Sequence, residues 1–372
     1  MEQLNPFIYD KPLSPDQLID RREEASRLLA LAEGGHNSRL SAPRRYGKTT
    51  LLRTVIADAE KAGLIAVYVD FSGVLTLADV AITIEEAYRL SLKGAVRRFV
   101  DDVLRTLRPG AAVGPPAARL EIQLQADDDL LRRLHRLLDL PARVHERQGQ
   151  RVLVVFDEFQ EALSAGRGMD GVIRGRIQHH GDAASYIFAG SHPGLMAELF
   201  DSRERPLFGQ ARAVQLAPLP DPELGDFIGR AFADSQREVG AILEPLLDLV
   251  RGHPQRAMLV AHHLWEQVPK GGEAEEESWA RALTSVFREL QEAFEYAWGN
   301  LPEGQRRVLG AVASSQASLY QRDTLKRFQL TKSSARSAAT ALRKRGDLEA
   351  TEPHGLHLVD PLFEAWIRER QA

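Results

Sequence analysis

Short apolar runs alternate with longer amphipathic stretches over the first two-thirds of the chain. Leu64–Phe71 (LIAVYVDF) and Arg151–Phe156 (RVLVVF) are rich in β-branched and apolar residues, and Ser185–Ala189 (SYIFA) is a third such run. Unbroken apolar runs of this length are typical of strands that are buried on both faces of a parallel sheet. We expect Ser38–Ser41, which is poorer in composition, as the first strand and Val214–Leu216 as a last, short one.

Helical segments are expected between these strands, over Lys48–Gly63, Ala78–Leu107 and Asp127–Arg147. The second of them ends at PGAAVGPPAA, a Pro/Gly/Ala stretch that predicts a surface loop. Strands that alternate with helices predict an α/β fold with a central parallel sheet and helices on both faces.

The pattern changes to helix alone after Pro218 and stays so to about Val268. An acidic, glycine-containing linker (PKGGEAEEES) follows, and a final unit begins near Trp279. This unit predicts three helices and then a hairpin of two short strands, the order of elements in a winged helix. The three helices are expected at Pro302–Ser314, Gln321–Gln329 and Thr331–Gly346, and the hairpin at Leu348–Val359.

These changes of pattern predict three domains, consistent with a length of 372 residues. They are an α/β domain over residues 1–218, a helical domain over 219–269 and a winged-helix domain over 279–372.

The composition excludes some chemistry and leaves the rest open. Hydrophobic residues make up 44% of the chain and charged residues 27%, which is ordinary for a protein with a sizeable core. The absence of cysteine excludes disulfides, cysteine-ligated zinc and a thiol nucleophile. We find neither a basic-then-apolar N-terminal stretch nor a window of about 18 apolar residues, so we expect a cytoplasmic protein without a membrane partner.

The sequence after the first expected strand resembles a phosphate-binding loop. APRRYGKT, from Ala42 to Thr49, fits G-x-x-x-x-G-K-[ST] except at its first position. Gly47 would allow the tight turn, Lys48 would reach the β- and γ-phosphates, and Thr49 would place its hydroxyl on Mg²⁺. The helix that starts here would aim its N–H groups at the anion. The expected nucleotide contacts are Pro43, Arg44, Arg45, Tyr46, Gly47, Lys48, Thr49 and Thr50.

Alanine at the first position of the motif matters only if that residue needs a positive φ or a very close backbone approach. The alternative is a basic turn before a helix, since GK[ST] alone is common. The position of the loop, between a strand and a helix, favours nucleotide binding.

An acidic pair follows the strand RVLVVF directly. Asp157 would lie in the outer coordination shell of Mg²⁺, and Glu158 would polarise the attacking water toward the γ-phosphate. The alternative is a helix N-terminus whose acids complement its dipole. Ser191, after the strand SYIFA, would bond the γ-phosphate or the water. His192 could do the same or cap the next helix.

The C-terminal unit is basic within a chain of net charge −4. Residues 302–350 hold ten Lys/Arg and four acids, a local charge of +6. In the third helix, Ala335, Ala338, Ala339 and Leu342 follow a core spacing. The cations expected to meet DNA phosphates are Lys332, Arg336, Arg343 and Lys344. The alternative is a solvated basic helix in a domain that contacts protein.

In this order, the motifs resemble the archaeal-type ATPase family of the STAND group, AAA+-related P-loop ATPases that act as signal-responsive switches. The resemblance covers nearly the whole chain. It rests on NPFxxxxPL and LIDRREEASRL, APRRYGKTTLL, VFDEFQ, FAGS, RPLFGQA, RGHPQRAMLVAHHLW and LHLVDPLFEAWIRER.

The resemblance implies further site residues and a central first strand. Asp20 and Arg21 would lie near the adenine or ribose. The helical domain over 219–269 would form a lid, and its residues His253 and Pro254 would lie near the nucleotide. A helix cap and turn is the alternative for the last two. Gln210 stands where the family commonly has arginine, so the source of a transition-state arginine is open. Nearby substitutes are Arg203, Arg205 and Arg212.

The expected function is an ATP-hydrolysing switch that uses ATP and Mg²⁺ and forms ADP, with double-stranded DNA, a protein or a second copy of the chain as further partners. ATP is favoured over GTP because we find no [NT]-K-x-D string. Two alternatives stay open. One is a DNA-binding regulator in which turnover is incidental, and the other is an interaction module of a defence or signalling assembly.

Overall fold

The computed structural model describes residues 4–11, 19–105, 119–314, 318–351 and 355–371, with only the backbone of residues 119–128 and 351. The chain divides into two compact units. The sheet unit comprises Arg22–Ala42 and Leu51–Leu216. The helical unit comprises Met1–Arg21, Pro43–Thr50 and Ala217–Ala372, so it contains the phosphate-loop sequence.

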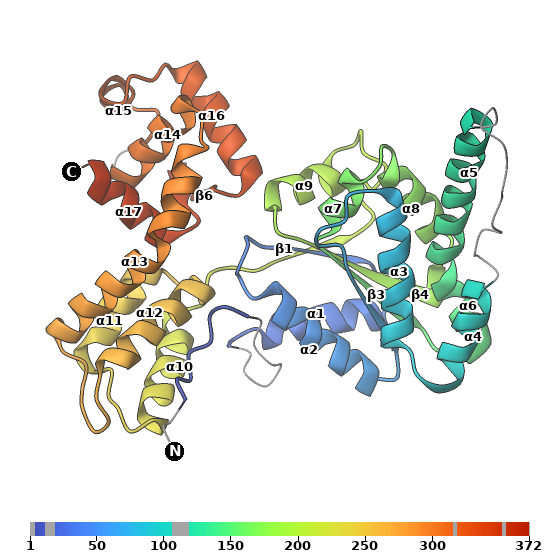
Figure 1. Cartoon of the computed structure of the whole chain (residues 1–372), viewed down its shortest axis with the longest axis horizontal. Coiled ribbons are helices and arrows are strands. Elements are labelled where there is room, and N and C mark those ends of the chain that lie inside the picture. The colour runs from blue at the N-terminus through green and yellow to red at the C-terminus, as the bar shows by residue number, and fades with distance from the viewer. Residues whose placement is uncertain (1–3, 12–18, 106–118, 315–317, 352–354, 372) are drawn as a thin grey trace. The chain divides into compact units, whose positions relative to one another are not determined.

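The sheet unit contains a parallel sheet of five strands in the order β2-β3-β4-β1-β5 (Figure 1). The strands are β1 (Ser38–Ser41), β2 (Ile65–Asp70), β3 (Val152–Asp157), β4 (Ala184–Gly190) and β5 (Arg212–Gln215). All five predicted strands are confirmed within two residues. β1 is an interior strand flanked by β4 and β5, although β4 is the middle strand.

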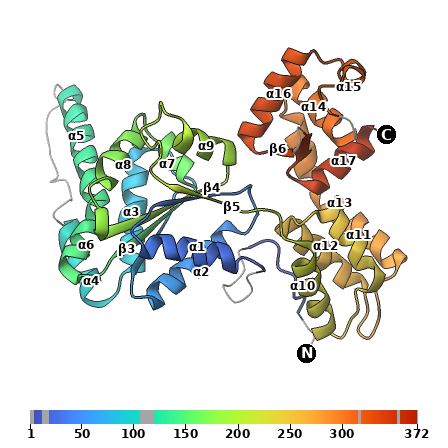
Figure 2. The ribbon, with the colours of Figure 1, turned by 180° about the vertical axis from the view of Figure 1, so that it is seen from behind.

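Helices cover both faces of this sheet, as the alternating pattern predicts. On one face lie α1 (Arg22–Glu33) and α2 (Lys48–Lys61), where Ser185 Oγ of β4 donates to the Ala32 carbonyl of α1 (Figures 1 and 2). The helices α3 to α9 share one apolar core with the other face. They are α3 (Leu77–Ser91), α4 (Gly94–Arg105), α5 (Arg119–Leu138), α6 (Leu140–Gln148), α7 (Phe159–Ser164), α8 (Met169–Ile177) and α9 (Pro193–Asp201).

Two of the predicted helices are each divided in the structure. The helix expected over Ala78–Leu107 is α3 and α4, because Leu92 is extended and buried, and Gly94 has φ +59°. Of the segment Asp127–Arg147, α5 ends at Leu138 and α6 begins at Leu140 with Pro141 in its first turn. Proline is accepted there but interrupts a continuous helix. The PGAAVGPPAA stretch lies outside the described residues.

The helical unit begins with the helices expected after Pro218 and ends with three helices, an antiparallel hairpin and one more helix. The boundaries are α10 (Asp221–Asp234), α11 (Leu243–Val250), α12 (Pro254–Gln267), α13 (Glu276–Gly299), α14 (Glu303–Ser314), α15 (Arg322–Arg327), α16 (Lys332–Arg345), β6 (Leu348–Thr351), β7 (Gly355–Leu358) and α17 (Pro361–Gln371). The order of helices and hairpin expected of a winged helix is therefore present. The domain boundaries 1–218, 219–269 and 279–372 stay predictions.

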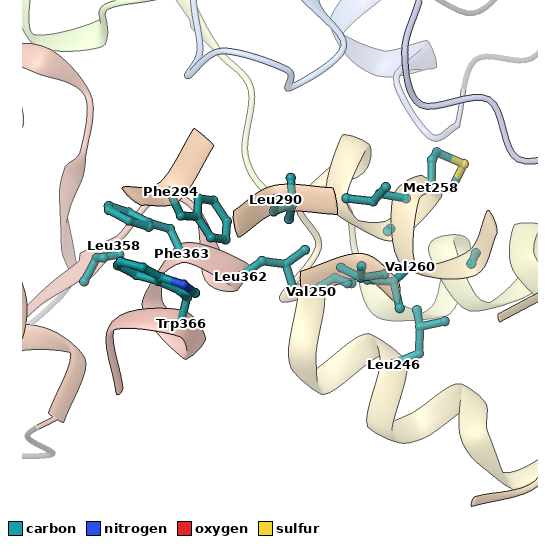
Figure 3. Packing of buried hydrophobic residues seen from close by; sticks show 14 of the residues in the cluster. Leu246, Val250, Met258, Val260, Leu290, Phe294, Leu358, Leu362, Phe363 and Trp366 are labelled. Carbon is teal, nitrogen blue, oxygen red and sulfur yellow. The ribbon is translucent and has the colours of Figure 1, made fainter. Parts of the chain in front are cut away.

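A single apolar core runs through the helical unit (Figure 3). The rings of Phe294 in α13 and Phe363 in α17 have centroids 5.0 Å apart, and Trp366 lies 5.9 Å from Phe294. The predicted linker is shorter than expected, since a capping box between Glu275 and Ser278 starts α13 inside it. The helix α13 therefore connects α12 to the C-terminal elements through packed side chains.

No helix in the described part of the chain combines the length and apolarity that crossing a membrane requires.

Candidate functional site

The phosphate-loop sequence leaves the carboxyl end of β1 at Ser41 and passes into α2 at Lys48. Gly47 has φ +83°, the left-handed region in which glycine is unstrained. Lys48 is buried at the start of α2, and the first turn of this helix contains no acidic residue. A loop with this backbone and charge suits an anion at the helix N-terminus.

Alanine fits the first position of the loop. Ala42 is not among the residues with positive φ, so a methyl group causes no backbone strain there. Its side chain is 1% exposed, and its N–H donates to the Gly190 carbonyl of β4 over 3.4 Å. The departure from the motif is therefore accommodated by packing beside β4.

The loop packs against the start of α12 in the helical unit. The ring of Tyr46 lies 4.9 Å from that of His253, nearly perpendicular to it. His253 is the N-cap residue of α12, and its Nδ1 accepts from the Arg256 N–H over 3.3 Å, while Pro254 occupies the first turn. The predicted cap is thus present, and it places His253 against the phosphate loop. Burial, with Arg256 and Arg45 adding to it, lowers the pKa of His253 to about 4.

An ion pair of the buried Arg256 with the partly buried Asp360 continues from this cap to the start of α17. Arg256 Nε lies 3.0 and 3.1 Å from the two carboxylate oxygens of Asp360, and its Nη2 bonds the same group. Burial acts to raise the pKa of Asp360, but Arg256 holds it below its usual value. The pKa of Arg45 is lowered by burial and by Arg256. Thus Arg45, Arg256 and Asp360 interact electrostatically.

A steric constraint explains why glycine occupies position 252 in the RGHPQ segment. Gly252 has φ +69°, and a Cβ on it would lie 2.2 Å from the Leu219 carbonyl oxygen. The Leu219 N–H donates to the Gly252 carbonyl over 2.8 Å. Only glycine allows this approach, which fixes the turn that precedes His253.

The two residues expected near the adenine also belong to the helical unit. Arg21 is 4% exposed, and its Nη2 donates to the Ala217 carbonyl over 2.5 Å. Asp20 is exposed and has φ +36°. Arg21 therefore anchors the segment that leads into α10.

In the sheet unit, Asp157 is the last residue of β3, as predicted. Its Oδ2 accepts from Tyr68 OH over 2.7 Å, and its Oδ1 accepts from the Glu158 N–H over 2.9 Å. Burial and then Asp157 raise the pKa of Tyr68. Tyr68 lies on the neighbouring strand β2 and holds the Asp157 carboxylate in one orientation.

Glu158 stands at the N-cap position of α7 in a left-handed conformation, with φ +46°. Its side chain makes no cap hydrogen bond, so it does not play the capping role. Its Oε2 accepts instead from Ser191 Oγ over 2.7 Å and from Gln160 Nε2. The structure therefore brings Asp157, Glu158 and Ser191 together at the carboxyl ends of β3 and β4.

His192 is less directly placed than Ser191. Its Nδ1 lies 3.3 Å from Ser191 Oγ, and it is the N-cap residue of α9 without a side-chain cap bond. Sequence reasoning missed Gln160 and Tyr68. Gln160 lies inside the VFDEFQ segment, two residues after Glu158, and Tyr68 lies on the strand next to β3. Both residues lie in segments that the sequence analysis identified, but the sequence does not give the directions of their side chains.

The arginines near Gln210 have partners of their own in the sheet unit. Arg205 Nη2 lies 2.5 Å from Glu198 Oε1, and Arg212 Nη2 lies 3.4 Å from His36 Nε2. The side chain of Gln210 donates to the Phe208 carbonyl over 3.4 Å, and Arg203 is exposed.

The basic face of α16 is exposed as predicted. Ala335, Ala339 and Leu342 are buried and Ala338 is partly buried, whereas Arg345 pairs with Asp347 over 2.8 Å. The cations predicted to meet DNA phosphates, which are Lys332, Arg336, Arg343 and Lys344, are all exposed, and so is Arg345.

Comparisons with solved structures give the class of fold. A Walker-type ATPase of Pyrococcus abyssi matches with a TM-score of 0.68 and 17% identity, over 97% of this chain and 99% of that one. The ORC2 protein of Aeropyrum pernix matches in its ADPNP–ADP complexes with a TM-score of 0.58 and 15% identity, over 99% and 98%. Its ADP form matches with a TM-score of 0.54 and 16% identity, over 98% and 97%.

At these identities the likeness concerns the fold. The chain has the α/β fold of P-loop ATPases, with a central parallel sheet and a C-terminal helical region. No family model and no curated protein matches the sequence.

Proposed function

We propose that this chain is a Mg²⁺-dependent ATPase that binds ATP, hydrolyses it to ADP and phosphate, and acts as a switch like the STAND proteins it resembles. The observation that carries the proposal is the connection from β1 through the loop to α2, with Gly47 in its left-handed turn and Lys48 at the start of the helix. The fold of a Walker-type ATPase supports it.

The residues present suit a nucleotide and its metal ion. The loop from Pro43 to Thr50 has N–H groups and cations for the phosphates, with Lys48 for the β- and γ-phosphates. Thr49 and Asp157 are the residues that would hold Mg²⁺, Asp157 through water. The bound ion would neutralise charge that develops on the phosphates. His253, Pro254, Asp20 and Arg21 are proposed as further nucleotide contacts.

Glu158 is the proposed group that orients and polarises the attacking water. Ser191 donates to its carboxylate and, once nucleotide is bound, would contact the water or the γ-phosphate. Tyr68 keeps Asp157 oriented.

The proposed output of the switch is the C-terminal unit. Tyr46 of the loop contacts His253, His253 caps the helix that carries Arg256, and Arg256 pairs with Asp360 at the start of α17. Each contact lies within the helical unit, so a change in the loop on hydrolysis has a short path of side chains to α17. This path supports control of the C-terminal helices by nucleotide state.

The test is ATP turnover by the wild type and by Glu158→Gln, with and without duplex DNA, alongside nucleotide affinity. We expect Glu158→Gln to keep its affinity for ATP and to lose about 100-fold or more in kcat. Glu161→Gln, on the same helix, is the matched control and should turn over normally. A wild type that binds ATP but does not hydrolyse it under either condition would leave the nucleotide-binding regulator as the function.

We further propose that α16 contacts double-stranded DNA, as the third helix of a winged helix. The exposed Lys332, Arg336 and Arg343 support phosphate contacts. Changing all three to alanine should weaken binding and reduce the slope of log affinity against log salt by up to about 3. The matched control changes Arg132, Arg143 and Arg147, which are exposed in the sheet unit. Equal binding by both triple variants would favour a protein partner or a second copy of the chain.

A further inference from the structure

We propose that Gln160 is a positioning residue for hydrolysis. Its side-chain amide holds the Glu158 carboxylate and the Ser191 hydroxyl in one arrangement, and this arrangement sets the rate of turnover without changing the affinity for nucleotide. The inference rests on the proposed ATPase function and adds to it a residue that touches neither nucleotide nor water.

Three side chains form a closed triangle of hydrogen bonds in the sheet unit. Gln160 Nε2 bonds Glu158 Oε2 and lies 3.3 Å from Ser191 Oγ. Ser191 Oγ donates to the same Oε2 over 2.7 Å. Since each of the three polar atoms contacts the other two, moving any member of the triangle breaks two bonds.

The local backbone makes such support necessary. Glu158 has φ +46°, a backbone conformation that residues other than glycine adopt only at a cost in free energy. Its side chain has three rotatable bonds and no role as a helix cap. Without donors from its neighbours, the carboxylate would lose its fixed direction, and an oriented base is what water attack requires.

The surroundings fix the amide itself. Gln160 is 4% exposed, and a Cβ on Gly190 would lie 2.7 Å from its Oε1 and 2.6 Å from Met196 Sδ. Gly190 therefore leaves the space that the amide fills. A flipped amide would point Oε1 at the carboxylate of Glu158, so the bonds to Glu158 and Ser191 determine its orientation.

That orientation leaves Oε1 buried and without a hydrogen-bond partner among the described residues. A buried unpaired oxygen is unfavourable for folding. A leucine of similar size would fill the same space without this penalty. The presence of an amide at this position is therefore better explained by its hydrogen bonds to Glu158 and Ser191 than by packing.

The experiment compares Gln160→Leu, which removes both donors, with Gln178→Leu, which changes an exposed glutamine of the same unit. We expect Gln160→Leu to lower kcat by about 10- to 100-fold, with the Kd for ATP within about twofold of the wild type. Gln178→Leu should retain the wild-type values. Gln160→Glu should be at least as slow as Gln160→Leu, because it places a second carboxylate against Glu158.

A second variant reaches the same amide without removing it. Gly190 does not have a positive φ, so its backbone accepts alanine without strain. The added methyl group would displace the Gln160 amide. We therefore expect Gly190→Ala to lower kcat and to leave the Kd for ATP unchanged. Combined with Gln160→Leu, it should add little further loss, since both act through one amide.

The outcomes separate this inference from the function on which it rests. If Glu158→Gln abolishes turnover and Gln160→Leu keeps or raises kcat, the positioning role is wrong and the ATPase stands. If Gln160→Leu lowers the thermal midpoint, the affinity and kcat together, its role is structural and the inference is again overturned. A wild type without turnover overturns both.

Discussion

The acidic end of β3 and the phosphate-loop side of the helical unit are built from different interactions. At the end of β3, Tyr68 donates a hydrogen bond to Asp157, and Gln160 and Ser191 donate to Glu158. Around the loop, the contacts pass through a ring pair and then through the ion pair of Arg256 with Asp360.

This difference suggests a division of tasks. Neutral donors fix the direction in which a carboxylate points. An ion pair between α12 and the residue before α17 couples two parts of the helical unit, and its loss leaves a partly buried carboxylate without its counter-charge. We therefore expect changes at the end of β3 to alter turnover, and changes beside the loop to alter stability and communication with α17.

The largest effect on stability is expected from Arg256→Ala. The Arg256 side chain is 5% exposed, and its removal leaves Asp360 without its main counter-charge. The free energy of unfolding should fall by about 3 kcal/mol, measured by urea denaturation. Arg281→Ala, which breaks an exposed pair with Glu277, should cost less than about 0.5 kcal/mol. Similar losses of unfolding free energy for both variants would show that the ion pair of Arg256 with Asp360 stabilises the protein no more than an exposed pair does.

An effect of comparable size is expected from the protonation of His253. Its pKa falls from the ordinary 6.5 to about 4 in the folded protein, so the unfolded chain binds the proton more tightly. The stability that neutral His253 provides is complete above about pH 6.5 and is lost as the pH falls toward 4, by up to about 3 kcal/mol. Denaturation at several pH values should show this slope, and it should flatten in His253→Asn, which retains a capping acceptor. Parallel slopes for wild type and variant would contradict the assignment.

Tyr68→Phe tests the end of β3 and should lower the free energy of unfolding by less than the changes beside the loop. It removes the donor to Asp157 and leaves the ring in place, which predicts a loss of about 1.5 kcal/mol in the free energy of unfolding. Turnover should fall as well, since Asp157 would lose its orientation, and the Mg²⁺ concentration that gives half-maximal rate should rise. Tyr296→Phe, at a residue 76% exposed, is the control. An unchanged Mg²⁺ dependence would separate Tyr68 from the metal site.

The smallest effect is expected from Ala42→Gly, which restores the usual first glycine of the loop motif. The variant loses a buried methyl group and gains freedom in the unfolded chain, so it should be less stable by about 1 kcal/mol. Its affinity for ATP, measured by calorimetry, should stay within about twofold of the wild type, because Ala42 has no positive φ. A large gain in affinity would mean that the methyl group hinders the approach of the phosphates.

The sequence predicted the sheet well because its strands are buried on both faces and apolar along their length. β3 and β4 are buried throughout, and a continuous apolar run of this kind is a strong signal. Even the polar β1 was found, since the loop motif after it marks where a strand must end. The divided helices α3/α4 and α5/α6 were missed because periodicity continues across a short break, and only Gly94 and Pro141 signal it.

The candidate site was predictable only where it follows motifs. Asp157, Glu158 and Ser191 come at strand ends, and neighbouring parallel strands bring such ends together. The support by Tyr68 and Gln160 depends on side-chain directions that residue spacing does not give. The contact of Tyr46 with His253 joins segments far apart in the chain, and only the folded structure identifies it.

The helical unit is assembled from three separate pieces of the chain, and the middle one is the phosphate loop. During synthesis, Tyr46 leaves the ribosome long before His253, its packing partner, has been made. Contacts between such distant segments form late and slow the folding of the unit that contains them. The sheet unit can thus gain its core while the loop still lacks its own partners, so a nascent chain would place the proposed hydrolytic carboxylates before the proposed nucleotide-binding loop is complete.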